Sequence, residues 1–316
     1  MARVITLTPN PALDLSTSVE RLIPTHKLRC GPALRHPGGG GVNVARVLHR
    51  LGMPVQAWLL AGGPTGAAVH ALLEGEGVPA LALPIAGATR ENFAVIETGT
   101  GREYRFVLPG PEVGEREWQD CLDRLTAPGE APRWLVLSGG LAPGMPDDFY
   151  ARLAQALRPR GTRIALDSTG PALAAALRTG VDVVKPSLSE LCAYTGQPLA
   201  TLAERSAAAH ALVRSASAAW VALSLGEQGA LLAHGTGLWH APALAVPAAL
   251  GTTGAGDSFL AGLLWAIERG AAPPEALCQA MAAGAAALLG AGTALARRED
   301  VERLAPGVRV EAVPVP

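Results

Sequence analysis

The chain has 316 residues, of which 49% are hydrophobic, so it can bury one large core. Its formal net charge of -1 at pH 7 provides no basic surface for nucleic acid. The longest weakly polar run, residues 280–296, is mostly alanine and glycine, which is typical of a packed interior helix rather than a membrane span. Prolines lie too close to the N-terminus to leave room for the apolar stretch of a signal sequence. The 4 cysteines are not spaced as in a zinc site or a disulfide framework. We therefore expect a cytoplasmic protein with no nucleic-acid or membrane partner.

The first strand candidate, residues 4–7, ends in the polar segment Thr8-Pro-Asn-Pro-Ala-Leu-Asp14. Residues 15–34 then read as short strands joined by turns. Four glycines, Gly38 to Gly41, follow and open an amphipathic helix that reaches Leu51. Successive glycines carry a large entropy cost on folding, so they indicate a place where a ligand approaches the main chain. A flexible linker is the alternative, but no Ser-rich tract surrounds them.

Residues 92–108 form a second group of short strands, with a hairpin turn at Thr98-Gly-Thr-Gly101. Together with residues 15–34 this group predicts a small separate sheet. From residue 134 to residue 184 apolar strand candidates alternate with helical patterns, which indicates right-handed βαβ units and a mostly parallel sheet. Ligands bind beyond the carboxyl ends of such strands. Four polar residues follow strand candidates and could gather at that edge: Asp14, Ser138, Asp167 and Lys185.

The last third of the chain carries the most informative segment. After Lys185-Pro-Ser-Leu-Ser-Glu190 come predicted helices at 188–195 and 202–213 and strands at 220–223, 230–234 and 238–240. The segment 251–259, Gly-Thr-Thr-Gly-Ala-Gly-Asp-Ser-Phe, precedes the apolar run 260–267, and a helix is expected to begin near Asp257. Backbone amides at a glycine-rich helix start can bind an anion, and Asp257 would lie beside it as a base. The alternative is that Asp257 merely caps the helix. The Pro-rich end, residues 313–316, is expected to be frayed.

Lysine usage adds a further signal. Lys27 and Lys185 are the only lysines, which leaves 24 arginines among the 26 basic residues. Lysine is a compact point charge and arginine a bulky planar fork, so retained lysines indicate sites where size matters. The alternative is that these two lysines escaped replacement by arginine through chance. Both, however, fall within segments already selected on other grounds.

Taken in order, these segments resemble the ribokinase-like (PfkB) family of sugar kinases, and most of all its hexose-phosphate branch, of the minor-isozyme 6-phosphofructokinase type. The resemblance runs from residue 4 to about residue 300. It implies a single kinase domain, residues 1–316, folded as a three-layer α/β/α sandwich with a mostly parallel central sheet. The small β-sheet lid would draw its strands from about 15–35 and 91–108. A homodimer through this lid is implied as well.

The implied activity is ATP-dependent phosphorylation of fructose 6-phosphate to fructose 1,6-bisphosphate. The four-glycine form resembles the 6-phosphofructokinase type, whereas Asn10-Pro-Ala is closer to 1-phosphofructokinases and tagatose-6-phosphate kinases, so these activities stay open. A non-catalytic sugar-phosphate or nucleotide sensor is the alternative outside the enzyme class. Ser187 stands where the family usually has Asn, and Gly140 where the 6-phosphofructokinase type has Ser.

The resemblance also assigns site residues. The catalytic group comprises the base Asp257 and the anion hole of Gly254, Ala255 and Gly256. The substrate group comprises Asp14, Lys27, Gly38, Gly39, Gly40, Asn43, Arg90, Asn92, Arg105 and Ser138. The ATP group comprises Lys185, Ser187, Ser224, Gly226 and Gly229. Glu190 would bind Mg²⁺ through water, and a monovalent cation such as K⁺ would lie against backbone near Gly251, Thr253, Ala287, Gly290 and Gly292.

Overall fold

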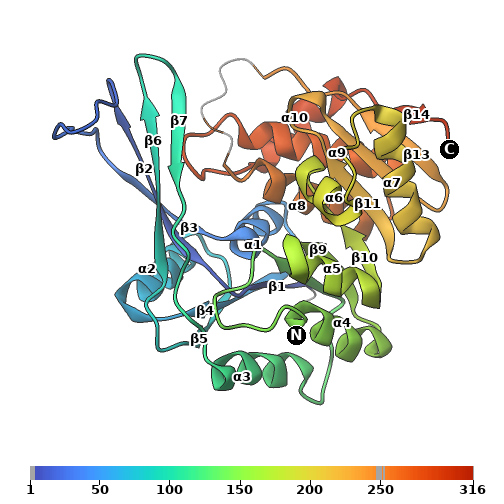
Figure 1. Cartoon of the computed structure of the whole chain (residues 1–316), viewed down its shortest axis with the longest axis horizontal. Helices are drawn as coiled ribbons and strands as arrows, with labels where there is room; N and C mark the ends of the chain where they lie inside the picture. Colours follow the sequence, from blue (N-terminus) through green and yellow to red (C-terminus); the bar gives the residue numbers. More distant parts are fainter. Residues whose placement is uncertain (1–3, 247–250, 252, 316) are drawn as a thin grey trace.

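The computed structural model describes residues 4–246, 251 and 253–315 (Figure 1). Its largest element is a ten-stranded sheet in the order β14-β13-β12-β11-β10-β9-β8-β1-β4-β5. The strands from β5 to β11 run parallel: β5 (Ala80–Pro84), β4 (Val55–Ala61), β1 (Val4–Thr8), β8 (Trp134–Ser138), β9 (Arg163–Asp167), β10 (Val181–Val184) and β11 (Ala218–Ser224). The remaining strands pair antiparallel: β12 (Ala230–His234), β13 (Gly237–Ala241) and β14 (Glu311–Val313).

Helices cover both faces of this sheet, because its strands are apolar on both sides. In β1, Val4 belongs to one core cluster while Ile5 and Leu7 belong to the other. The first face carries α1 (Gly40–Arg50), α2 (Gly63–Gly75), α8 (Ala255–Glu268), α9 (Pro273–Ala287) and α10 (Arg298–Leu304). The second carries α3 (Glu115–Thr126), α4 (Phe149–Leu157), α5 (Gly170–Thr179), α6 (Leu188–Thr195) and α7 (Leu202–Arg214). The predicted three-layer α/β/α sandwich is therefore confirmed.

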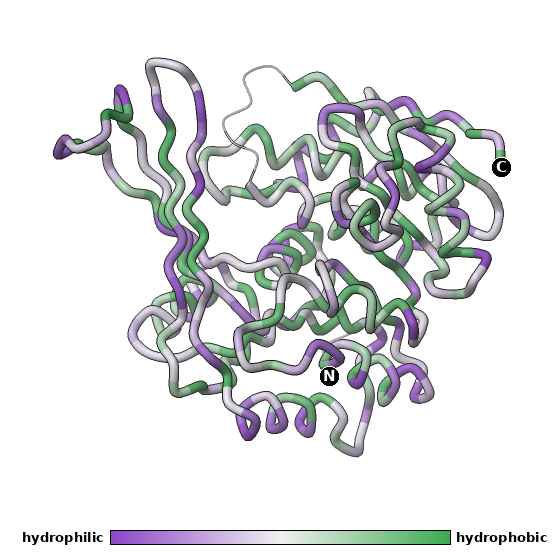
Figure 2. The backbone as a smooth tube through the Cα atoms, viewed as in Figure 1, coloured by the Kyte–Doolittle hydropathy of each residue, from purple (hydrophilic) through white to green (hydrophobic). Residues whose placement is uncertain are grey.

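The distribution of hydropathy follows these layers. Figure 2 shows hydrophobic stretches along the central strands and hydrophilic segments on the outer turns of α3. In that helix Trp118, Cys121 and Leu125 are buried, at the three- and four-residue spacing of one helix face. The helix pair α8 and α9 packs especially closely, since a Cβ at Gly262 would lie 2.7 Å from the Cβ of Ala283. This close packing fixes the position of α8.

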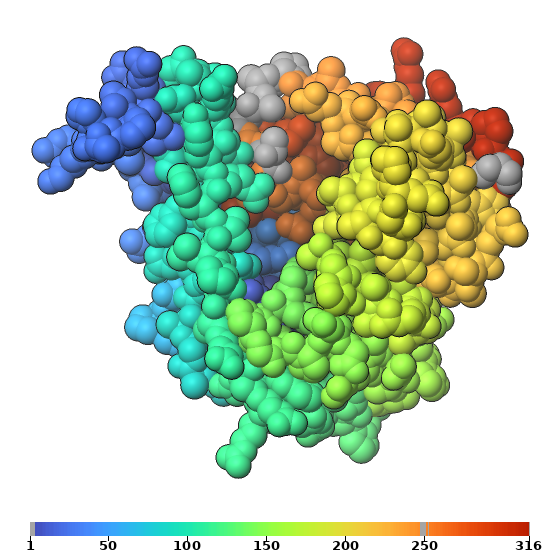
Figure 3. All heavy atoms as spheres, viewed as in Figure 1, coloured from blue at the N-terminus to red at the C-terminus, as the bar shows by residue number. Residues whose placement is uncertain are grey.

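The smaller sheet has four strands in the order β3-β2-β6-β7, and we call it the lid sheet: β3 (Leu34–Gly38), β2 (Ala12–Val19), β6 (Arg90–Glu97) and β7 (Arg102–Phe106). It rises from one side of the main body, and the space-filling view shows a hollow between the two (Figures 1 and 3). Asp14 on β2 pairs with His36 on β3 and with Asn92 on β6. The register therefore places these three polar residues side by side across the sheet.

The C-terminal segment departs from the sequence prediction. Residue 313 was expected to be frayed, but Val313 pairs with Leu238 in the antiparallel edge of the large sheet. The strand β14 has three residues, too few for a periodic pattern in the sequence. It is recognised in the structure by its pairing with β13. In the described part of the chain no helix has the length and apolar character needed to cross a membrane.

Candidate active site

The N-terminus of α8 lies at the carboxyl edge of the large sheet. Gly254 caps the helix with φ 80°, in the left-handed region that favours glycine. A Cβ at this position would also overlap the side chain of Leu295. Ala255, Gly256 and Asp257 form the first helical turn, so their amide groups have no partner within the helix. This turn can therefore bind an anion.

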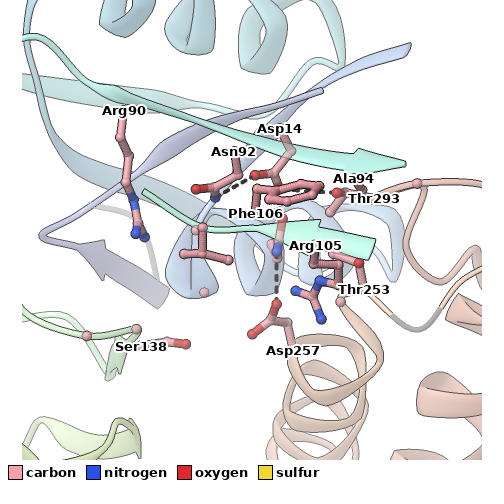
Figure 4. Close-up of a pocket in the computed structure, with 18 of the residues that line it drawn as sticks. Asp14, Arg90, Asn92, Ala94, Arg105, Phe106, Ser138, Thr253, Asp257 and Thr293 are labelled. Atoms are coloured by element: carbon pink, nitrogen blue, oxygen red, sulfur yellow. Dashed lines mark hydrogen bonds between the residues drawn. The ribbon is translucent and has the colours of Figure 1, made fainter. Parts of the chain in front are cut away.

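Asp257 projects from this turn into a pocket of about 300 Å³ beneath the lid sheet, which we call the first pocket (Figure 4). Its Oδ2 accepts a hydrogen bond of 2.8 Å from Nδ2 of Asn43, on α1. Burial and the negative charge of Asp167 raise the pKa of Asp257 to about 6, although the Asn43 bond acts in the opposite direction. A carboxylate with this pKa is ionised at neutral pH and is more basic than an ordinary aspartate, as suits a proton acceptor.

The roof of the first pocket is formed by the lid sheet. Asp14 accepts hydrogen bonds from Asn92 Nδ2 at 3.0 Å and from Thr293 Oγ1 at 3.1 Å. A Cβ at Gly38 would overlap the Asp14 carboxylate, so glycine is needed there for this arrangement. Figure 4 shows Asp14 and Asn92 above, and Ser138 and Asp257 below. Gly39 and Gly40 also line this pocket.

Several polar atoms around the first pocket are buried without a hydrogen-bond partner among the described residues. They include Ser138 Oγ, Asn43 Oδ1 and Thr253 Oγ1. Buried polar groups in native proteins are nearly always hydrogen-bonded, so these atoms are candidates for contacts with a polar ligand. A ligand rich in hydroxyl groups would satisfy them.

Two arginines reach the first pocket from the lid sheet. In Figure 4 the side chains of Arg90 and Arg105 extend from the lid toward the floor of the pocket. Arg90 donates to the carbonyl oxygens of Leu108 at 2.7 Å and Asn10 at 3.0 Å. Lys27, by contrast, is exposed on the loop between β2 and β3 and does not line this pocket. The fold of a single chain therefore does not bring Lys27 to the other predicted substrate residues.

Lys185 lies behind the anion-binding turn, at the end of β10. Its Nζ is 3.1 Å from Oδ1 of Asp167, and only 7% of the lysine side chain is exposed. Burial lowers the pKa of Lys185, but the carboxylates of Asp167 and Asp257 outweigh it, and the pKa ends above its ordinary value. A Cβ at Gly256 would lie 3.6 Å from Lys185 Nζ. A fixed positive charge thus stands beside the turn.

A second pocket of about 470 Å³ lies on the other side of the same turn. Ala255 and Gly256 line it, whereas Gly254 and Asp257 line the first pocket. The remaining walls are mostly apolar and include Phe259, Met281 and Leu288. The predicted ATP residues found here are Ser224, Gly226 and Gly229. The first turn of α8 therefore separates a polar pocket from a largely apolar one.

Glu190 and Ser187 form a capping box at the start of α6. Ser187 donates its backbone N–H to Glu190 Oε2 at 2.7 Å, and Ser187 Oγ accepts from the backbone N–H of Glu190 at 3.3 Å. Glu190 also lines the first pocket, as does Asp167. Ser187 thus caps the helix and orients the glutamate.

The residues predicted to surround a monovalent cation converge in part. A Cβ at Gly251 would lie 3.8 Å from the carbonyl oxygens of both Gly290 and Gly292. Thr253 and Gly292 line the first pocket, and Ala287 is the last residue of α9. Among the described residues, no cluster of three or more His, Cys, Asp or Glu side chains could hold a metal ion. Any cation here would depend on backbone oxygen atoms.

Asp167 and Thr293 are among the residues of the site that received no role from the sequence. Asp167 was recognised as the end of a strand, but its contact with Lys185 joins two neighbouring strand ends and needs the three-dimensional register. Thr293 lies in a glycine-rich segment after α9, and its bond to Asp14 spans 279 positions. In the sequence, the local signal for Thr293 was a hydroxyl residue within a glycine-rich segment.

Comparison with known proteins agrees with this geometry. The model of the pfkB family carbohydrate kinases matches residues 12–299. ATP-dependent 6-phosphofructokinase isozyme 2 of Mycobacterium tuberculosis H37Rv is 44% identical over 301 residues, which cover 95% of this chain and 88% of the relative. The isozyme 2 of Escherichia coli K12 is 36% identical, with coverage of 96% and 98%. A 1-phosphofructokinase of Xanthomonas campestris pv. campestris is 33% identical, with 99% of both chains covered.

Solved structures give the same result. The structure of E. coli phosphofructokinase-2 in complex with fructose-6-phosphate has a TM-score of 0.90 at 34% identity and covers 97% of this chain and 99% of that one. The complex of the same enzyme with potassium has a TM-score of 0.91 at 35% identity, with the same coverage. Family model, relatives and structures all span the two pockets and the turn between them, and the chain belongs to the pfkB family of carbohydrate kinases.

Proposed function

We propose that this kinase transfers the γ-phosphoryl group of ATP to fructose 6-phosphate and forms fructose 1,6-bisphosphate. The observation that carries the proposal is the first turn of α8, which separates the polar first pocket from the apolar second pocket. An acceptor hydroxyl in the first pocket and a nucleotide in the second would meet at this anion-binding turn. Relatives named 6-phosphofructokinase isozyme 2 support the choice of acceptor.

The chemistry follows from the groups at the turn. Asp257 accepts the proton of the sugar 1-hydroxyl. The oxygen of that hydroxyl forms a bond to the γ-phosphorus, and the bond between the γ-phosphorus and the ADP oxygen breaks. The amides of Gly254, Ala255 and Gly256 stabilise the charge on the phosphoryl oxygens in transit. Asn43 orients the Asp257 carboxylate through the 2.8 Å hydrogen bond. Lys185 adds a compact positive charge behind the turn.

Acceptor binding would use the roof and floor of the first pocket. Asp14 and Asn43 hold sugar hydroxyls, and Ser138 supplies an Oγ on the floor that has no hydrogen-bond partner among the described residues. Arg90 and Arg105 bind the phosphate already on the sugar, because a guanidinium can grip phosphate in a bidentate manner. Asn92 keeps Asp14 oriented through its 3.0 Å bond, and Gly38, Gly39 and Gly40 bring the main chain close to the sugar.

The donor is ATP with Mg²⁺, which one or two carboxylates can hold together with water and the phosphates of the nucleotide. Asp167 and Glu190 offer carboxylate oxygens at the first pocket, the ligand type that Mg²⁺ prefers, with Glu190 acting through water. When bound, Mg²⁺ neutralises charge on the β- and γ-phosphates. Ser224, Gly226 and Gly229 would contact the nucleotide, while Ser187 orients Glu190. K⁺ would bind the backbone oxygens near Gly251, as suits a carbonyl-lined site.

A parallel measurement of kcat/KM on three acceptors tests the proposal: fructose 6-phosphate, fructose 1-phosphate and tagatose 6-phosphate. Fructose 6-phosphate should give the highest value. The second candidate is 1-phosphofructokinase, since relatives with that name match nearly the whole chain. A preference for fructose 1-phosphate of about tenfold, equivalent to about 1.4 kcal/mol in the transition state, would overturn the first choice.

The Asp257→Asn variant distinguishes a kinase from a non-catalytic sensor. Removal of the base should lower kcat by about a hundredfold or more, with nucleotide binding retained. Binding of ATP is measured by calorimetry and turnover by ADP release. If the wild-type protein binds ATP and the sugar phosphate without turnover, it is a sensor. If turnover by Asp257→Asn equals that of the wild type, Asp257 is not the base.

The working unit is a homodimer formed through the lid sheet, in the cytoplasm where ATP and sugar phosphates are available. Ile23, on the loop between β2 and β3, and Leu34, on β3, support this proposal, because they are 43% and 48% exposed and do not line the first pocket. Lys27 would then reach the phosphate of the acceptor in the partner subunit. Mixing inactive Lys27→Ala with inactive Asp257→Asn should restore partial activity in heterodimers, because one of the two sites is then intact. If each subunit uses its own Lys27, mixing restores nothing once subunit exchange has been verified.

A further inference from the structure

Arg46 is the largest fully buried charged side chain among the described residues, with 1% of its side chain exposed. It lies on α1, one turn after Asn43. Its Nε and Nη2 donate to the two carboxylate oxygens of Glu76 at 3.0 Å and 2.6 Å. Its Nη1 donates to the carbonyl oxygens of Pro37 and Thr293, each at 3.1 Å. One guanidinium therefore joins three separate segments of the chain.

Glu76 follows the last residue of α2, where a carboxylate is unfavourable next to the helix dipole. Burial raises the pKa of Glu76, but hydrogen bonds and charge from Arg46 and Arg50 outweigh it and keep the pKa below its ordinary value. Arg50 adds a 2.9 Å bond to Oε2 and also binds the carbonyl oxygen of Ala294. The carboxylate is thus ionised and holds Arg46 in one orientation.

Thr293 links this ion pair to the first pocket. Its carbonyl oxygen accepts from Arg46, and its hydroxyl donates to Asp14 Oδ2 at 3.1 Å. Thr293 is 3% exposed, so its hydroxyl has little access to water in place of Asp14. Pro37, the other carbonyl partner of Arg46, directly precedes Gly38, the glycine that leaves room for the Asp14 carboxylate. Both contacts of Nη1 therefore lead to Asp14, one through the Thr293 hydroxyl, whose bond to Asp14 is drawn in Figure 4, and one through the main chain.

We propose that Arg46 is a positioning residue for acceptor binding, which holds the Asp14 carboxylate in place through Thr293 and Pro37. This inference rests on the proposed function, in which Asp14 binds sugar hydroxyls. Arg46 itself lines neither pocket, so it would act on the acceptor only through these contacts. Arg46 restrains the backbone at Pro37 and at Thr293. Without this restraint the two segments could move, and the Asp14 carboxylate could rotate away from the sugar.

The first experiment changes Thr293, because this residue can be varied without leaving a buried charge unpaired. Thr293→Val removes the hydroxyl and keeps the volume, so the KM of the acceptor should rise about tenfold, as expected from the loss of a hydrogen bond to a charged group. The KM of ATP should stay at the wild-type value. Thr293→Ser retains the hydroxyl and should restore the acceptor KM. A purely structural role would instead make both valine and serine variants less stable with no selective change in the acceptor KM.

The second experiment is a double-mutant cycle with Arg46→Lys. Lysine keeps the charge but cannot donate to Glu76 and to both carbonyl oxygens together, so the acceptor KM should again rise about tenfold. In the double variant Arg46→Lys/Thr293→Val, the KM should match that of Arg46→Lys alone, since the pathway is already broken. If the two substitutions act independently, their effects multiply and raise the acceptor KM of the double variant about a hundredfold, and this result would overturn the proposal.

Arg158→Lys is the matched control. Arg158 also donates to two carbonyl oxygens, those of Thr179 and Gly180, but it lies outside both pockets. This variant should lower the unfolding midpoint and leave the acceptor KM unchanged. All variants are compared on the acceptor that the wild-type protein uses best, so an error in the preferred sugar would not affect the comparison. If Arg46→Lys does not fold, an unchanged acceptor KM in Thr293→Val overturns the proposal by itself.

Discussion

Removal of the Asn43 amide should move the acid limb of the pH–rate profile to higher pH. With Asp257 as the proposed base, activity requires its ionised form, so kcat/KM should fall as the pH drops through the pKa of this residue, about 6. The 2.8 Å bond from Asn43 stabilises the ionised form. A hydrogen bond to a charged group contributes about 1.5–3 kcal/mol, and one pKa unit corresponds to about 1.4 kcal/mol. Asn43→Ala should therefore raise the midpoint by about one to two units.

The assay is kcat/KM of the acceptor from about pH 5 to about pH 9, since this ratio reports ionisations of the free enzyme. Asn92→Ala is the control, because its amide binds Asp14 instead of Asp257. Both variants should lose activity at the plateau, but only Asn43→Ala should shift the midpoint. A midpoint that stays within about 0.3 units of the wild-type value would refute the assignment of the acid limb to Asp257.

Three further substitutions test the close contacts of the site and the core. Gly38→Ala places a methyl group on the Asp14 carboxylate and should lower kcat/KM about a hundredfold, measured against an unchanged KM for ATP. Lys185→Arg keeps the charge but cannot fit beside Asp167, so the KM for ATP should rise about tenfold; a wild-type value would mean that size is irrelevant there. Gly262→Ala should lower the free energy of unfolding, measured in urea, by about 1–3 kcal/mol, because the added Cβ would meet α9. This loss exceeds the stabilisation of up to about 1 kcal/mol that alanine gains over glycine in helix propensity. An unfolding midpoint equal to the wild type would contradict the close packing of α8 and α9.

The alternating strands and helices of residues 134–184 were predictable, because side-chain periodicity is a local property that reports which faces of each element are buried. The start of α8 was predictable for a similar reason, to within two residues, since it was expected near Asp257 and lies at Ala255. A glycine turn, an acidic residue and an apolar run lie next to one another in the chain, so the local sequence specifies both the turn and its exposed amides. The resemblance of the ordered segments then gave the family, which the comparisons confirm.

Only the tertiary structure decided which side chains meet. The bonds of Thr293 to Asp14 and of Arg46 to Thr293 span 279 and 247 positions, and no local pattern encodes such pairings. The pKa of Asp257 likewise depends on Asp167 and Asn43, which come from other elements. Local sequence determines the elements because backbone preference and hydrophobic period act over a few residues. The distances between charges at the site depend on how those elements pack, and this is a property of the whole core.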